Sequence, residues 1–185
     1  LGVAVDAQNN LYVADYGSGR ILKLDTKYNP KGVDFQIVVG DTKWKGTDFG
    51  DGGPAISAGL WGPGDVTIAS DNTMYILEQD SYRIRKVDAS GTISVYAGTG
   101  TAGYSGNEGL AASAQFNFDN EQSSKLEIDP AGNILIADSG NNVIRRIRTA
   151  TNIIETISGK GIPGFTGDNK WAIDGEHTLP YGVGC

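Results

Sequence analysis

The chain has 185 residues, 27 of them glycine, and a formal net charge of −7 at pH 7. Glycine at about twice its usual frequency of ~7 %, with few helix-favouring stretches, predicts many tight turns between short strands. An acidic balance without a basic stripe argues against nucleic acid as the main ligand, and no apolar run reaches the roughly 18–20 residues that span a bilayer.

Four short strands are predicted first, and their pattern then recurs twice along the chain. Val3 and Val5 alternate with smaller residues as in a half-buried strand, and the near-continuous apolar run at 11–14 indicates a strand covered on both faces. A third strand and a fourth strand that ends at a glycine complete the unit. The expected strands lie at residues 2–6, 10–15, 20–25, 35–39, 65–68, 73–78, 83–88, 92–96, 125–129, 133–138, 143–148 and 153–157.

Equivalent positions recur about every sixty residues. The second strand of each unit ends at Asp15, Glu78 or Asp138, so the offsets are 63 (15 to 78) and 60 (78 to 138) residues. A period of this size indicates a supersecondary unit repeated in an array. Repeated four-stranded antiparallel sheets are the blades of a β-propeller, in which radial repetition leaves only short, protected edges. The sequence therefore predicts an all-β fold.

The repeated blocks resemble NHL-repeat propeller blades. The blocks that carry the resemblance are Gly2-Val-Ala-Val-Asp6, Asn10-Leu-Tyr-Val-Ala-Asp15 and Arg83-Ile-Arg-Lys-Val-Asp88. The loop at 50–63 is similar to the inter-blade connector of an NHL subgroup that occurs in large extracellular or cell-surface proteins, teneurin-like ones among them. This resemblance implies an extracellular or cell-surface location.

We expect one partial NHL β-propeller over residues 1–185. Its blade units lie at about 1–63, 64–123 and 124–181, with the start of a fourth at 182–185. Three blades are roughly half of a six-bladed ring and cannot close it. The missing blades are therefore expected from the same longer chain or, alternatively, from a second copy.

The recurring acidic residues have two interpretations. Asp15, Glu78 and Asp138 are candidates for a ring of carboxylates that binds a cation. The alternative, which we favour, is structural: Arg20 and Arg83 follow five residues after Asp15 and Glu78, across the hairpin, where ion pairing and capping of turn amides are natural.

The glycine-rich connectors between units lack the strand-to-helix context of a phosphate loop. Tyr104 and Phe165 in these connectors are predicted to plug the space between adjacent blades. No cofactor is expected, with Ca²⁺ at Asp48, Asp51 and Asp168 as the alternative, because calcium prefers oxygen ligands on flexible backbone.

Three connector residues are candidate partner contacts. Trp44 lies in a loop found only in the first unit, Trp171 replaces a smaller residue, and His177 stands where the other connectors carry Leu60 and Phe116. Exposed tryptophans stack on sugars or anchor protein partners. A further tryptophan, at position 61, is predicted to be a packing residue.

The functional hypothesis is a non-catalytic protein-interaction or scaffolding module of a larger, extracellular or surface protein, with a protein or glycan ligand on its connector loops. With one cysteine, Cys185, and one histidine, His177, the chain forms no internal disulfide and no site with two histidines. Two alternatives stay open. One is a propeller enzyme, a metal-dependent lyase or hydrolase, with its site outside these residues. The other is an RNA-binding NHL platform.

Overall fold

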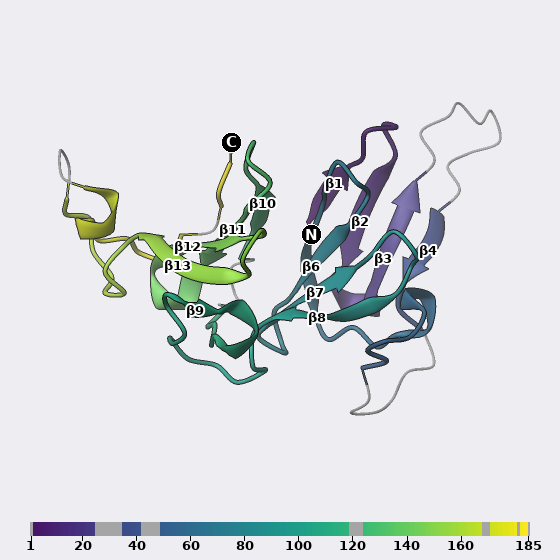
Figure 1. Cartoon of the computed structure of the whole chain (residues 1–185), viewed down its shortest axis with the longest axis horizontal. Helices are drawn as coiled ribbons and strands as arrows, with labels where there is room; N and C mark the ends of the chain where they lie inside the picture. Colours follow the sequence, from purple (N-terminus) through teal and green to yellow (C-terminus); the bar gives the residue numbers. More distant parts are fainter. Residues whose placement is uncertain are drawn as a thin grey trace.

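The computed structural model describes residues 2–24, 35–41, 49–118, 124–167, 171–180 and 182–184, and every structural statement below concerns these residues. They form three antiparallel sheets that follow one another along the chain (Figure 1). The first sheet has the order β1 (Val3–Val5), β2 (Leu11–Asp15), β3 (Arg20–Leu24) and β4 (Phe35–Val39). The second has the order β5 (Pro63–Ile68), β6 (Met74–Glu78), β7 (Arg83–Val87) and β8 (Ile93–Ala97). The third has the order β10 (Leu126–Ile128), β11 (Ile134–Asp138), β12 (Val143–Arg148), β13 (Ile153–Ser158) and β9 (Gly109–Leu110).

The predicted all-β fold of four-stranded antiparallel blades is confirmed. The remaining elements are short 3₁₀ turns after the second strand or in the connectors: η1 (Tyr16–Ser18), η2 (Ala55–Ser57), η3 (Ala111–Ser113), η4 (Ser139–Asn141) and η5 (Ala172–Asp174). Aspartate side chains hold the first hairpin of the first and third sheets, because Asp6 accepts hydrogen bonds from the backbone N–H of Asn10 (2.8 Å) and Asp129 accepts one from Asn133 (2.8 Å).

We call the segment between the last strand of one blade and the first strand of the next a connector. Each of the first two connectors, between β4 and β5 and between β8 and β10, pairs with the outer strand of the following blade. The first connector donates from the Gly52 N–H to the Ile93 carbonyl (2.8 Å) and accepts from the Ile93 N–H at Gly53 (3.0 Å). In the second connector the corresponding segment is the strand β9. It pairs with β13 and makes the third sheet five-stranded. This added strand was not predicted. It provides hydrogen-bond partners for backbone groups at the outer edge of the following blade and thereby connects adjacent blades.

The apolar core lies between adjacent sheets. Ala14 and Ile21 of the first sheet pack in one cluster with Ile76 and Ile93 of the second. The second and third sheets share another cluster, which includes the stacked rings of Phe116 and Phe118 at 5.1 Å between centroids. The other members of this cluster include Leu77, Ile84, Ile136 and Ile147. A fully buried isoleucine contributes about 1.5–3 kcal/mol, so these interfaces dominate the stability.

One face of the first sheet packs against the second sheet. The opposite face of the first sheet is also apolar, but among the described residues no sheet lies against it. Cross-strand register aligns Val3, Val13, Leu22 and Ile37 on it, and two residues along it aligns Val5, Leu11, Leu24 and Phe35. In the second sheet the corresponding face, with Val66 and Ile76, is buried against the first sheet. The repeat therefore builds one face for packing on the preceding blade.

Candidate functional site

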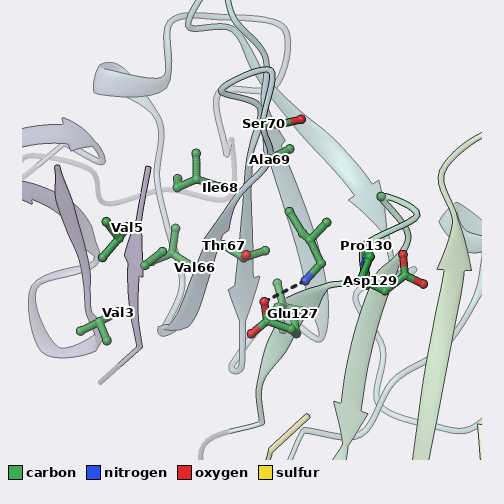
Figure 2. A pocket seen from close by; sticks show the side chains of 14 residues that line it. Val3, Val5, Val66, Thr67, Ile68, Ala69, Ser70, Glu127, Asp129 and Pro130 are labelled. Atoms are coloured by element: carbon green, nitrogen blue, oxygen red, sulfur yellow. Dashed lines mark hydrogen bonds between the residues drawn. The ribbon is translucent and has the colours of Figure 1, made fainter. Parts of the chain in front are cut away.

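A groove lies along the innermost strands β1, β5 and β10. It has a volume of about 520 Å³ and is lined by side chains of these strands and of the turns that follow them, among them Val5, Thr67, Glu127 and Asp129 (Figure 2). The Glu127 carboxylate accepts a hydrogen bond from the Ile128 N–H (3.3 Å), and Asp129 is used by its own turn. The groove occupies the position of a propeller's central channel. The residues described here include no group of three acidic, histidine or cysteine side chains able to hold a metal ion.

Asp65 joins two innermost strands. Its carboxylate accepts from the Leu126 N–H (2.8 Å) and lies 3.4 Å from the Lys125 ammonium in the next blade. Burial raises the pKa of Asp65 above its ordinary value, against the opposing effect of these partners. This carboxylate therefore connects blades.

The recurring acidic residue of the second blade also holds a blade junction. Glu78 is fully buried and accepts from the Trp61 N–H of the first connector (2.9 Å). Its charge partner is Arg85, at 3.3 Å, which is also fully buried. Arg85 in turn donates to the Gly59 carbonyl (3.2 Å) and pairs with Asp51 (2.7 Å) in the same connector. Burial raises the pKa of Glu78, although Arg85 favours its charged form.

The third blade repeats this arrangement. Asp138 accepts from the Asn117 N–H (2.9 Å), and the Arg145 guanidinium lies 3.6 Å from its carboxylate. Arg145 donates to the carbonyls of Gln115 (2.9 Å) and Ser105 (2.8 Å) in the second connector. Burial raises the pKa of Asp138 to about 6 and lowers the pKa of Arg145. We call each of these buried carboxylate–arginine–connector sets a junction lock.

The predicted hairpin partners lie where the register requires but make different contacts. Asp15 is aligned with Arg20 and Glu78 with Arg83 across their hairpins. Nevertheless, Asp15 accepts from the Ser18 hydroxyl (2.6 Å), and the ion pair of Glu78 is with Arg85. Arg83 instead lies over the Phe49 ring, 5.1 Å from its centroid. The partner of the carboxylate is thus two residues farther along the third strand than expected.

Sequence reasoning missed Arg85 and Arg145 as the centres of the junction locks. The available signal was their shared position, the third residue of the third strand, where the first sheet carries Leu22. Alternation alone assigns this position to an inward face, where an arginine interrupts the apolar pattern. The role of the arginine follows only from the connector of the preceding blade, whose carbonyls it contacts.

The two predicted plugs differ. The Tyr104 ring lies over the Arg145 guanidinium at 5.4 Å, and its hydroxyl is 2.8 Å from that of Thr156, so Tyr104 does bridge two blades. Phe165, in the third connector, is 88 % exposed. The described residues place no following blade against it.

The candidate partner contacts are also placed differently from one another. Trp171 is 82 % exposed at the start of η5. The Nε2 atom of His177 lies 2.6 Å from the Ser158 hydroxyl, which is also 3.2 Å from the Ala172 carbonyl. The remaining predicted residues, Trp44, Asp48, Asp168 and Cys185, lie outside the described residues. Asp51, the third calcium candidate, is engaged by Arg85 in the first junction lock.

Three blades of this kind, joined through crossing connectors around a central groove, define a β-propeller. The NHL repeat matches residues 1–24. Teneurin-1 of Gallus gallus is 28 % identical in an alignment of 170 residues that covers 86 % of this chain and 6 % of that protein. Together these findings support an NHL-repeat β-propeller family for this chain.

Solved structures agree on the fold. A structural genomics protein of unknown function from Bacteroides thetaiotaomicron is 17 % identical, with a TM-score of 0.71 over 97 % of this chain and 40 % of that one. An auxiliary nutrient binding protein from the same organism is 14 % identical, with a TM-score of 0.63 over 97 % of this chain and 41 % of that one. The chain therefore spans about two fifths of the length of these two proteins. No helix among the described residues is long and apolar enough to cross a membrane.

Proposed function

We propose that this chain is part of a non-catalytic, protein-binding propeller in a larger extracellular or cell-surface protein, with its connector loops as the binding surface. The similarity to a teneurin supports the location and a teneurin-like connector type. In this proposal the blade units are 1–63, 64–123 and 124–181, and further blades of the same longer chain or of a second copy cover the apolar outer face of the first sheet.

The exposure of Trp171 carries the proposal. Trp171 occupies the connector position held by Pro54 and Leu110, each of which directly precedes the alanine that opens a 3₁₀ turn. Pro54 is exposed and Leu110 is 58 % exposed, although the next blade is packed against both of their connectors. A following blade would therefore leave Trp171 exposed too. A solvent-facing indole at a place where the fold accepts proline is typical of a partner contact.

The recurring carboxylates support a structural rather than a catalytic reading. Glu78 and Asp138 are enclosed in the junction locks and cannot reach a ligand without opening a blade interface. The close Ser158–His177 pair replaces the apolar pairs Val39–Leu60 and Ala97–Phe116 of the earlier junctions. The Ser158 hydroxyl ends a regular β-strand, without the strand-to-helix turn that presents a nucleophilic serine.

A site-specific photocrosslinker tests the proposal. Placed at position 171 of the full-length protein in its native cells, it should give a discrete crosslinked protein that is identified by mass spectrometry. The matched control is the same group at Ala89, which is exposed in a turn of the second blade. With the identified partner purified, Trp171→Leu should weaken binding at least about tenfold, as expected for a central aromatic contact.

Equal crosslinking at the two positions, or unchanged affinity of Trp171→Leu, would show that the connector is not the binding surface. Turnover of a lactone or a glycoside by the purified protein that is lost on Ser158→Ala would replace the proposal with an enzymatic one.

A further inference from the structure

The junction between the first and second blades carries aromatic and acidic side chains that the repeat does not require. Trp61 and Asn117 are equivalent, because the N–H of each donates to the buried carboxylate of its junction lock. Tyr16 follows Asp15 directly, as Gln79 follows Glu78, and Asp80 lies two residues after Glu78, as Gly140 lies two residues after Asp138. Tyr16 and Asp80 of the first junction therefore correspond to Gln79 and Gly140 of the second. The second junction thus shows that this architecture forms without an aromatic side chain at any of these positions.

The Trp61 indole is held on a rigid base yet faces solvent. It is 51 % exposed with both neighbouring blades in place. Its ring stacks on Phe49 at 6.2 Å between centroids and 23° between planes. The Phe49 ring is itself covered by the Arg83 guanidinium, and the Trp61 N–H is fixed by Glu78. Trp61 therefore packs on Phe49, as predicted, and also presents a flat apolar face to solvent.

A carboxylate is held beside the residue that follows Trp61. The Tyr16 hydroxyl donates to both oxygens of Asp80, at 2.8 and 3.0 Å, and Tyr16 is 41 % exposed. Gly62, the residue after Trp61, lies against both groups: a Cβ built on it would be 2.5 Å from Asp80 Oδ2 and 2.9 Å from the Tyr16 ring. The phenol and the oriented carboxylate therefore lie against the backbone one residue after the exposed indole.

We propose that this surface, formed by Trp61, Tyr16 and Asp80, is a binding site for a neutral carbohydrate, a pyranoside with vicinal hydroxyl groups. The C–H face of a pyranose ring stacks on an indole through apolar contact. A carboxylate whose orientation is fixed by a phenol retains acceptor positions for two adjacent hydroxyls. Because the Arg83 guanidinium lies over the Phe49 ring on which the Trp61 indole stacks, the site contains a cation as well as the Asp80 carboxylate, which suits a neutral ligand.

Calorimetric titration of the full-length protein with cellohexaose, laminarihexaose, maltohexaose and mannohexaose tests the site. We expect at least one of these neutral oligosaccharides to bind, with an affinity that changes little between low and high salt because no ion pair forms. Trp61→Asn, Tyr16→Gln and Asp80→Gly install the residues of the second junction and are therefore compatible with the blade. Trp61→Asn should weaken binding at least about tenfold, whereas Trp171→Leu should leave it unchanged.

Hydroxyl-radical footprinting of the unmodified protein provides a readout that needs no variant. Oxidation of Trp61 and Tyr16 should fall when the bound oligosaccharide is present, while oxidation of Trp171 stays constant. Lack of binding by all four sugars at about 10 mM, where weak single-site stacking of ~3 kcal/mol still registers, would overturn the proposal. Protection of Trp171 in place of Trp61, or full affinity in Trp61→Asn, would overturn it equally.

Discussion

Replacing Arg145 by leucine, the residue that the first blade carries at the same position, tests the junction lock directly. The change removes hydrogen bonds to the Gln115 and Ser105 carbonyls (2.9 and 2.8 Å) and leaves the fully buried Asp138 carboxylate without a cation. Hydrogen bonds to a charged donor contribute about 1.5–3 kcal/mol each, and breaking a buried ion pair costs about 3–5 kcal/mol. The added leucine methyl groups recover part of the loss. We expect the free energy of unfolding to fall by about 3–5 kcal/mol at about pH 8.

The penalty should depend on pH in a defined direction. Burial already raises the pKa of Asp138 to about 6 with Arg145 present, so removal of Arg145 raises it further. At about pH 5 the buried Asp138 of the variant is neutral and no charge is stranded. The loss should therefore be smaller there than at about pH 8, by up to ~1.4 kcal/mol for each further unit of pKa.

Urea unfolding of the wild-type and variant proteins, followed by tryptophan fluorescence at both pH values, measures these quantities. Arg148→Leu is the control on the same strand, because Arg148 is half exposed and its partner Glu155 keeps Arg146. It should cost at most about 1 kcal/mol. A loss below ~1 kcal/mol for Arg145→Leu, or a loss independent of pH, would refute the view that the lock stabilises the blade interface.

Three further outcomes follow from the blade geometry. Gly98→Ala should lower the free energy of unfolding by about 2 kcal/mol or more, because φ is +95° and the new Cβ would lie 2.4 Å from the Tyr82 carbonyl oxygen. Gly132→Ala is the control, since its φ of +83° is similar but the new Cβ would meet open space. In thermal unfolding this control should cost only about 1 kcal/mol. Because the pKa of Asp138 rises from 3.8 to about 6 on folding, the folded state binds its proton more tightly. The free energy of unfolding should thus decline by up to ~3 kcal/mol as the pH rises from about 4 to about 6, and Asp138→Asn should flatten that slope in urea titrations. Asp65→Ala should expose the inner strand of the third blade, seen as faster amide hydrogen exchange at Leu126 with β6 unchanged.

Much of the fold could be predicted from the sequence, because the strand pattern repeats. Alternating and near-continuous apolar runs, bounded by turn residues and recurring every 60 or so residues, predicted the strands of all three sheets because strand periodicity and turn chemistry are local properties. The connector strand β9 was not predictable in this way. It has two residues, Gly109 and Leu110, and forms only because the outer strand of the next blade presents an unpaired edge.

For the candidate sites as well, the sequence predicted the local features and the tertiary structure decided the contacts between blades. Sequence alone determined that acidic residues recur at the end of each second strand, and it predicted that Trp61 and Trp171 fall in connectors and that Tyr104 reaches a neighbouring blade. Only the tertiary structure decided that Glu78 pairs with Arg85 rather than Arg83, that Trp61 is half exposed, and that Asp80 lies against Gly62. The physical reason is that a side chain's partner and its exposure depend on which blade packs beside it. The hydrogen bonds from Trp61 to Glu78 and from Tyr16 to Asp80 join residues 17 and 64 positions apart, and no pattern within one strand records them.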